Sequence, residues 1–400
     1  MRAGGLSKAR FGRLHDVMAS YVERGAVAGI VTLVSRGGEV HRDAIGRTAL
    51  DGDDPMRPDT LFRIASMTKP VAAVAAMILV EEAKLRLDDP VDRWLPELAD
   101  RKVLRSPLSA LHDTVPASRP LTLRDLLTMR AGYGLVMDGA GDHPIQQAMD
   151  AAGISPGPTP PALEPDELIL RFARLPLIHQ PGERWLYHTS FEILAVLIAR
   201  AAGMPFEEFL QQRIFAPLGM TDTTFSVPAG QQSRLATCYE GDAAIGGLVL
   251  YEDGHGGHFA HHAVTPSGGS GLVATVDDYL AFGRMLLNCG RHGTERILAR
   301  PTVQAMTTDQ LTPAQKAASP FFPRFWESRG WGFGVSMVTR RDDVASVPGR
   351  FGWDGGFGTS WSSDPQEDLV GVLMIQRLYD PTVAAINADF WTLVYQALDD

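Results

Sequence analysis

Short runs rich in β-branched and other apolar residues, bounded by turn residues, predict β-strands at both ends of the chain. Near the N-terminus, GIVTLVSRGGEVHRDAIG predicts strands over Gly29 to Ser35 and Glu39 to Ile45, joined by Gly37 and Gly38, a pair typical of tight hairpins. Near the C-terminus, TSWSSDPQEDLVGVLMIQ predicts strands over Thr359 to Ser363 and Leu369 to Gln376 around a polar turn. We therefore expect an antiparallel sheet built from both ends of the chain.

Helical spacing of apolar residues frames this sheet and fills the middle of the sequence. The first helix is marked by apolar residues at Phe11, Leu14, Val17, Met18 and Tyr21, and a closing helix is predicted over Val383 to Leu398. Between them, helical patterns run over Val71 to Lys84, LTLRDLLTMRAG to Gly132, PDELILRFARLP, and TSFEILAVLIARAAG to Gly203. The proline-rich stretch from Ser155 to Pro165 is predicted as a loop within this helical block.

These patterns predict an α+β fold of two intergrown regions. Residues 1–65 and 225–400 form an α/β region whose antiparallel sheet is flanked by the terminal helices, and residues 66–224 form a mainly helical insertion. Because clefts between regions commonly hold active sites, we expect the active site in the groove between the two.

Composition narrows the class of protein. The chain has 400 residues, of which 45% are hydrophobic and 21% charged, as expected for a globular enzyme. Its net charge of −10 and lack of a basic run argue against nucleic acid as a partner. The longest apolar run, near Val71 to Val80, is too short for a membrane span, and the N-terminus has no continuous apolar signal core. Cys238 and Cys289, the two cysteines, are expected to be unpaired thiols, so we expect a cytoplasmic protein.

Ser66 and Lys69 are the first candidates for chemistry, and their spacing alone allows two interpretations. Ser66 is suited to the N-cap of the helix that follows, with Lys69 then an ordinary solvated lysine. Alternatively, residues three apart share a helix face, so the Lys69 amine can reach the Ser66 hydroxyl and act as its base if burial keeps the amine neutral.

A larger set of motifs favours the second interpretation. The stretches LFRIASMTKPV, LTLRDLLTMRAGYG, PGERWLYHTSFEILAVLIA, IFAPLGMTDTTF and PSGGSGLVATVDDYLAFGRML, in this order, resemble the serine β-lactamase and penicillin-recognising hydrolase superfamily. The likeness covers nearly the whole chain and is greatest to its class C-like branch. The resemblance implies a β-lactamase-like fold and makes Ser66 the nucleophile, with Lys69 and Tyr187 as its general base and acid.

The same resemblance assigns further residues to the site. Thr189 occupies the position at which class C enzymes carry an asparagine that contacts the substrate amide, which puts lactam binding in doubt. Trp353, Asp354 and Gly355 stand where those enzymes have the K-[TS]-G motif, and they resemble the W-[GSA]-G variant of the class C-like carboxylesterases called family VIII. The resemblance further implies that the Ser66 and Gly356 N–H groups form the oxyanion hole.

These residues predict a serine carboxylesterase that hydrolyses short-chain neutral esters through an acyl-enzyme. Three alternatives remain: an acyltransferase with the same catalytic residues, a weak β-lactamase or peptidase, and a binding protein that has kept the fold without activity. The natural acyl group, the alcohol and the oligomeric state stay open.

Two other kinds of site are less well supported by the sequence. The α/β-hydrolase elbow G-x-S-x-G is approached only at Gly268 to Leu272, where the last position fails. The histidines at 255, 258, 261 and 262 have the spacing of zinc ligands, but they lie in a glycine-rich stretch without a rigid framework. We therefore expect no metal and no cofactor, and a loop over the cleft at this place.

Overall fold

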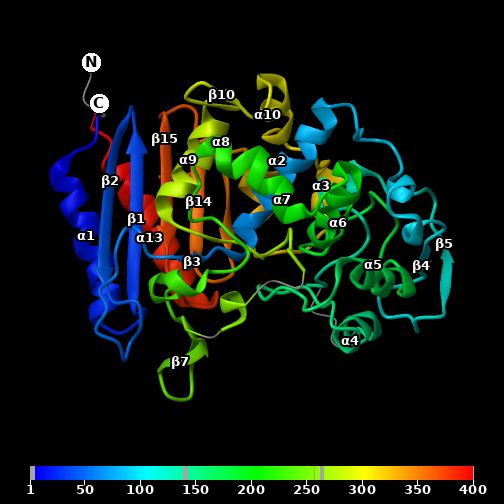
Figure 1. Cartoon of the computed structure of the whole chain (residues 1–400), viewed down its shortest axis with the longest axis horizontal. Helices are drawn as coiled ribbons and strands as arrows, with labels where there is room; N and C mark the ends of the chain where they lie inside the picture. Colours follow the sequence, from blue (N-terminus) through cyan, green and yellow to red (C-terminus); the bar gives the residue numbers. More distant parts are fainter. Residues whose placement is uncertain (1–4, 138–142, 256, 262–264, 400) are drawn as a thin grey trace.

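One seven-stranded antiparallel sheet organises the molecule (Figure 1). This computed structural model describes residues 5–137, 143–255, 257–261 and 265–399. In spatial order, the strands are β11 (Arg329–Trp331), β12 (Ser336–Val338), β13 (Phe351–Gly355), β14 (Thr359–Asp364), β15 (Leu369–Met374), β1 (Gly29–Arg36) and β2 (Glu39–Gly46). The N-terminal hairpin thus pairs with the last strand, which confirms that the sheet is built from both ends of the chain.

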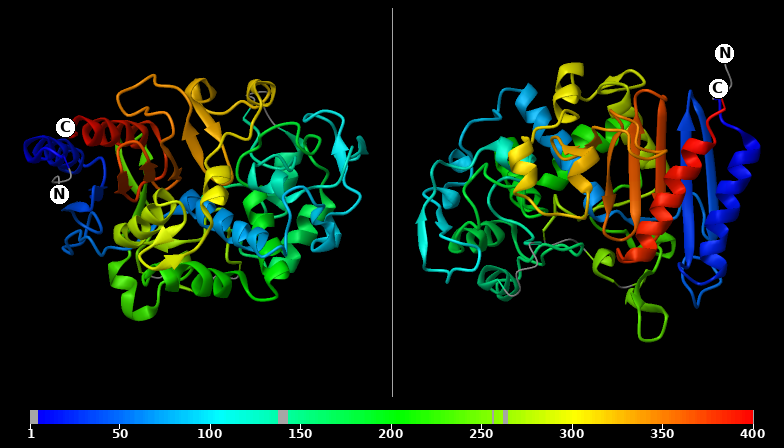
Figure 2. Two further views of the ribbon diagram at one scale, coloured as in Figure 1. Left: turned by 90° about the horizontal axis from the view of Figure 1, so that it is seen from above. Right: turned by 180° about the vertical axis from the view of Figure 1, so that it is seen from behind.

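Helices cover both faces of this sheet. Figure 2 shows α1 (Lys8–Glu23) and α13 (Pro381–Gln396) side by side on one face, where they contact each other. The other face is covered by α9 (Val276–Leu287), which packs on β1, β14 and β15. Strand β1 is buried along its whole length because helices pack on both of its faces, and most of its residues are apolar for the same reason.

The helical part lies beside the sheet (Figure 1). Its helices are α2 (Thr68–Glu81), α3 (Leu123–Leu127), α4 (Pro144–Ala151), α5 (Pro165–Arg174), α6 (Ser190–Ala202), α7 (Phe206–Leu210) and α8 (Ala216–Leu218). The predicted helix to Gly203 is confirmed, since Gly203 caps α6 with a left-handed φ of +70°. The predicted helix to Gly132 is much shorter than expected: α3 starts at a Thr122 capping box and ends at Leu127.

The central helix α2 differs from its prediction in a way that matters for the site. It begins at Thr68 rather than Val71 and ends at Glu81. Its side chains from Thr68 to Leu79 are all buried, which requires apolar neighbours on every side. Four of these residues are alanines, and their small side chains allow α6 to pack close to α2.

The remaining elements are short. They comprise α10 (Arg300–Met306), α11 (Pro313–Ala317), α12 (Phe325–Ser328) and four two-stranded ribbons: β3 (Phe62–Arg63) with β8 (Val273–Ala274), β4 (Lys102–Leu104) with β5 (Thr114–Pro116), β6 (Cys238–Asp242) with β7 (Gly247–Glu252), and β9 (Arg291–His292) with β10 (Glu295–Arg296). The ribbon of β4 and β5 lies within residues 66–224, the part that was predicted to be mainly helical. Within the described ranges, no helix combines the length and the apolar character that a membrane crossing requires.

Candidate active site

Ser66 lies in a strained turn at the entrance to α2. The turn Ala65–Met67 is a 3-10 helix, and Ala65 has a φ of +42°, a left-handed conformation that costs a residue with a Cβ about 1 to 2 kcal/mol. Met67 occupies the N-cap position of α2, and no side chain makes a capping hydrogen bond there. Ser66 is therefore not used as a helix cap, and its side chain is turned to the cavity described below.

Lys69 lies one turn further along α2 and is completely buried. Its Nζ lies 3.0 Å from Ser66 Oγ, within hydrogen-bonding distance, and donates a hydrogen bond to the Gly269 carbonyl at 2.6 Å. Burial lowers the pKa of Lys69 from 10.5 to about 7, and the negative charge of Glu192 partly opposes this fall. A substantial fraction of Lys69 is therefore neutral near pH 7, as a general base requires.

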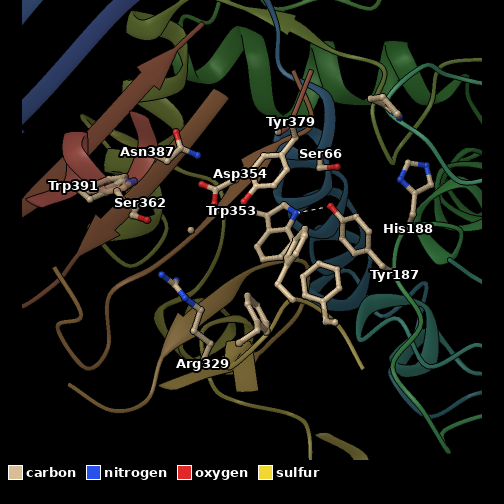
Figure 3. A pocket seen from close by; sticks show the side chains of 18 of the residues that line it. Ser66, Tyr187, His188, Arg329, Trp353, Asp354, Ser362, Tyr379, Asn387 and Trp391 are labelled. Atoms are coloured by element: carbon tan, nitrogen blue, oxygen red, sulfur yellow. Dashed lines mark hydrogen bonds between the residues drawn. The ribbon is translucent and has the colours of Figure 1, made fainter. Parts of the chain in front are cut away.

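Tyr187 reaches the same place from the segment that precedes α6. Its hydroxyl accepts a hydrogen bond from Trp353 Nε1 at 2.8 Å (Figure 3). The Lys69 Nζ lies 4.7 Å from the centre of the Tyr187 ring. Burial raises the pKa of Tyr187 above its ordinary 10, and the charge of Asp354 raises it further, although the nearby Ser66 hydroxyl and the Trp353 N–H oppose this rise. The phenol thus keeps its proton at neutral pH and is available as an acid.

Strand β13 brings the third group of predicted residues to the cleft. A Cβ on Gly355 would lie 2.2 Å from Thr359 Oγ1 and 2.3 Å from the Ile64 carbonyl, so only glycine lets this strand approach the turn that carries Ser66. Gly356 follows directly and lines the same cavity as Ser66. The main chain of β13 and the turn of Ser66 therefore border one space, as an oxyanion hole requires.

Trp353 and Asp354 point to opposite faces of β13, because side chains alternate along a strand. Trp353 packs against Trp331, with ring centres 4.7 Å apart, and reaches Tyr187. Asp354 is exposed within the cavity and accepts a hydrogen bond from Ser360 Oγ at 2.5 Å. The surrounding protein desolvates this carboxyl group and raises its pKa.

The cavity that joins these residues has a volume of about 560 Å³. It is bordered by Ser66, Tyr187 and His188 on one side and continues past Trp353 towards α13 (Figure 3). Its aromatic walls are formed by Phe321, Phe322, Phe325, Trp353 and Tyr379. Its polar far end is formed by Arg329, Asp354, Ser362 and Asn387. The size is that of a site for a small organic molecule.

The structure does not bring Thr189 to this cavity. Thr189 is 1% exposed, its Oγ1 has no hydrogen-bond partner, and it is absent from the lining. The preceding residue, His188, lines the cavity instead, with its Nδ1 3.3 Å from Lys69 Nζ. The motif-based reasoning missed His188 and its neighbour Glu192, although their spacing of four at the start of α6 was a visible signal.

The histidine-rich stretch gives no sign of a metal site where it is described. Among the described residues, no group of three or more His, Cys, Asp or Glu side chains is placed to hold a metal ion. His262 lies outside the described residues. Cys238 is buried, Cys289 is half-buried, and both are free thiols.

The chain is similar in sequence to known proteins over most of its length. The beta-lactamase family model matches residues 14–396. Protein Rv1367c of Mycobacterium tuberculosis is 40% identical over 379 residues, which cover 92% of this chain and 90% of that protein. Esterase EstB of Burkholderia gladioli is 32% identical over 389 residues, which cover 92% and 91%.

A solved structure extends the likeness to the fold. EstCE1, described as a hydrolase with promiscuous acyltransferase activity, superposes with a TM-score of 0.79 at 26% identity and covers 97% of this chain and 99% of its own. The family match spans nearly the whole chain, and the esterase relatives agree with the resemblance that the motifs around Ser66 and Tyr187 indicate. The chain belongs to the beta-lactamase family.

Proposed function

We propose that this protein is a serine carboxylesterase that hydrolyses short-chain neutral esters through an acyl-enzyme on Ser66. The observation that carries the proposal is the hydrogen bond of 3.0 Å between Ser66 Oγ and a fully buried Lys69 whose pKa is lowered to about 7. A serine hydroxyl is a weak nucleophile unless a base removes its proton, and this amine has both the position and the acidity for that task. The esterase name of the relative EstB supports the same class of reaction.

In the first half of the reaction, neutral Lys69 takes the Ser66 proton as Oγ attacks the ester carbonyl. The carbonyl electrons move to the oxygen, whose charge is stabilised by the N–H groups of Ser66 and Gly356. The carbonyl re-forms as the bond to the alcohol breaks, and Tyr187 donates its proton to the departing alkoxide. Protonated Lys69, whose Nζ lies 4.7 Å from the centre of the Tyr187 ring, then returns a proton to the Tyr187 phenolate.

In the second half, water attacks the acyl-enzyme by the reverse sequence. Tyr187 passes its proton to neutral Lys69 and takes up the proton of the attacking water, and protonated Lys69 then protonates Ser66 Oγ as the acyl group leaves. Because the two groups act on one proton, their titrations are coupled, and the observed pKa values describe the pair of residues rather than either one alone.

The charges along the cavity support neutral substrates. Arg329 and Arg350 line it together with Asp343 and Asp354, so these opposite charges are equal in number. Trp353 stands where lactam-binding relatives have a lysine, and the negative charge of Asp354 beside it repels a substrate carboxylate. The aromatic walls favour an apolar acyl or alcohol group.

Acyl transfer to an alcohol other than water is the second candidate, because EstCE1 is described as having both activities. The same Ser66 acyl-enzyme serves either reaction, and only the acceptor differs. A β-lactamase activity is less favoured, since Trp353 and Asp354 replace the lysine motif.

The proposal is tested with a panel of p-nitrophenyl esters, amides and β-lactams, with and without added alcohols. We expect hydrolysis of acetate and butyrate esters by the wild type and a loss of at least about a hundredfold in Ser66→Ala. Ser109→Ala, which alters a serine in an outer loop, is the matched control and should retain full activity. A Ser66→Ala variant as active as that control would overturn the mechanism, and preferential transfer to alcohols would replace hydrolysis by acyl transfer.

A further inference from the structure

A buried histidine and glutamate stand directly behind the lysine of the site. His188 Nε2 lies 3.2 Å from Glu192 Oε1, and the exposed fractions of these residues are 5% and 2%. Ser267 Oγ donates a second hydrogen bond to the same carboxylate oxygen at 2.6 Å. The chemistry described above uses neither residue, yet burying a carboxylate in the core is costly unless it is compensated.

Glu192 determines which nitrogen of His188 carries the proton. A carboxylate only accepts hydrogen bonds, so in the neutral imidazole the hydrogen resides on Nε2, which faces Glu192. His188 Nδ1 is then left with a lone pair, and this lone pair faces Lys69 Nζ at 3.3 Å. His188 is thereby an acceptor towards Lys69.

This arrangement orients the neutral amine. A neutral lysine has two hydrogens and one lone pair, and Lys69 has two acceptors besides Ser66: the Gly269 carbonyl at 2.6 Å and His188 Nδ1 at 3.3 Å. If both hydrogens are engaged by those acceptors, the remaining lone pair is directed at the Ser66 hydroxyl, 3.0 Å away. A base must present its lone pair to the proton it removes.

We infer that His188 and Glu192 form a positioning dyad that directs the lone pair of Lys69 at Ser66 and keeps a compensating negative charge beside the ammonium that forms. The inference rests on the proposed function, because it assumes that Lys69 is the base. Neither residue contacts the reacting atoms of a substrate in this role, and both act through Lys69.

Local backbone features support a specific placement of the dyad. His188 has a φ of +87°, a conformation unfavourable for a residue with a Cβ, and this conformation directs its ring at Lys69 while Tyr187 faces Trp353. A Cβ on Gly269 would lie 2.3 Å from Glu192 Oε1 and 3.1 Å from His188 Nε2. The strained histidine and the glycine opposite are both needed for the dyad to fit.

The charges around Lys69 give the inference a measurable consequence. The groups that face the amine are Ser66 from the turn before α2, the Tyr187 ring, His188, and Glu192 from α6, and of these only Glu192 carries a fixed negative charge. Glu192 raises the pKa of Lys69 against the larger effect of burial. Removing its charge should therefore leave Lys69 neutral at a lower pH.

The first test is the variant Glu192→Gln, which keeps the shape of the side chain and removes its charge. The readout is the rate of Ser66 labelling by a fluorophosphonate as a function of pH, because this rate reports the nucleophilic attack of Ser66 without any later deacylation step. We expect the acidic limb of the profile to move to lower pH by about one unit. Glu97→Gln is the matched control, since Glu97 pairs with Arg200 at the far end of the same helix at 2.9 Å, and its profile should match that of the wild type. An unshifted acidic limb in Glu192→Gln would overturn the inference.

The second test separates positioning from packing at His188. His188→Phe keeps a ring but removes the acceptor, whereas His188→Asn restores an acceptor close to the position of Nδ1 and tolerates a positive φ. We expect labelling to slow by at least on the order of tenfold in His188→Phe and to recover most of that loss in His188→Asn. Equal rates in the two variants would contradict a positioning role.

These outcomes distinguish the inference from the proposed function. Wild-type protein that is not labelled at Ser66 overturns the proposed function and the inference with it. Normal wild-type labelling, with all variants behaving as the wild type does, overturns the inference alone. Should His188→Phe fail to fold, the isosteric Glu192→Gln still decides the question.

Discussion

Replacing Lys69 by methionine tests the buried amine through stability, independently of any substrate. Methionine has a similar length and no charge, and it suits an apolar environment. Because burial lowers the pKa of Lys69 from 10.5 to about 7, the unfolded chain binds a proton between these pH values that the folded protein does not bind. The cost of burying Lys69 is therefore largest below pH 7 and disappears as the pH rises past 10.5.

The magnitude follows from this difference in pKa. Each unit corresponds to about 1.4 kcal/mol, so between pH 7 and pH 9 the free energy of unfolding of the wild type should rise by about 2 kcal/mol relative to that of Lys69→Met. The hydrogen bonds of Lys69 to Ser66, Gly269 and His188 are lost in the variant at every pH. Losing these hydrogen bonds therefore changes the difference in unfolding free energy between the two proteins by the same amount at every pH, and it leaves the pH dependence of that difference unchanged.

The assay is urea unfolding at pH 7, 8 and 9, with Lys84→Met as the matched control. The Lys84 side chain is 47% exposed and pairs with Glu82 on the surface, so its removal should leave the pH dependence of the wild type intact. Parallel pH dependences for the wild type and Lys69→Met would refute the reasoning, because they would mean that Lys69 is not held neutral by burial.

Three further predictions concern activity. Lys69→Ala and Tyr187→Phe should each remove nearly all esterase activity, and the double variant should be little less active than either single variant, because the effects of residues that act as one unit are non-additive. A double variant whose loss equals the product of the two single losses would argue against a shared proton. Trp353→Phe, which removes the N–H that donates to Tyr187, should lower kcat by about tenfold with little loss of stability. An unchanged kcat would show that this hydrogen bond does not contribute to catalysis. The wild type should hydrolyse p-nitrophenyl butyrate with a kcat/KM that exceeds its value for a penicillin by orders of magnitude, and Trp353→Lys should narrow the gap by lowering KM for the lactam; equal wild-type efficiencies would contradict the substrate class.

Much of the fold was predictable because its sheet has simple signals. The two glycines between β1 and β2 predict the hairpin, and an apolar pattern that stops at Gly203 predicts α6. The predicted start of α2 was three residues late, since the helix includes Pro70 in its first turn, where proline is well tolerated. The short helix α3 was overestimated because its apolar spacing continues past Leu127, where tertiary contacts impose another conformation.

The site was predictable where a motif marks it and not where tertiary packing creates it. Ser66, Lys69 and Tyr187 belong to motifs, and the structure brings all three together. His188 was not recognised because its contact with Lys69 depends on a positive φ, which a sequence does not announce for a histidine.

The far part of the cavity was hidden from the sequence for a similar reason. Arg329 on β11 and Asn387 on α13 are distant in the chain from Ser66, and no local pattern links them to it. Only the order of the strands and the packing of α13 on the sheet bring them to one cavity.

The most direct test of the central claim is to trap the acyl-enzyme and locate it. The protein is mixed with p-nitrophenyl butyrate, quenched in acid within the first turnover, digested and analysed by mass spectrometry. We predict that the peptide containing Ser66 gains the mass of one butyryl group in the wild type and gains none in Ser66→Ala. Hydrolysis with no acyl group on Ser66, or with the acyl group on another residue, would contradict the account.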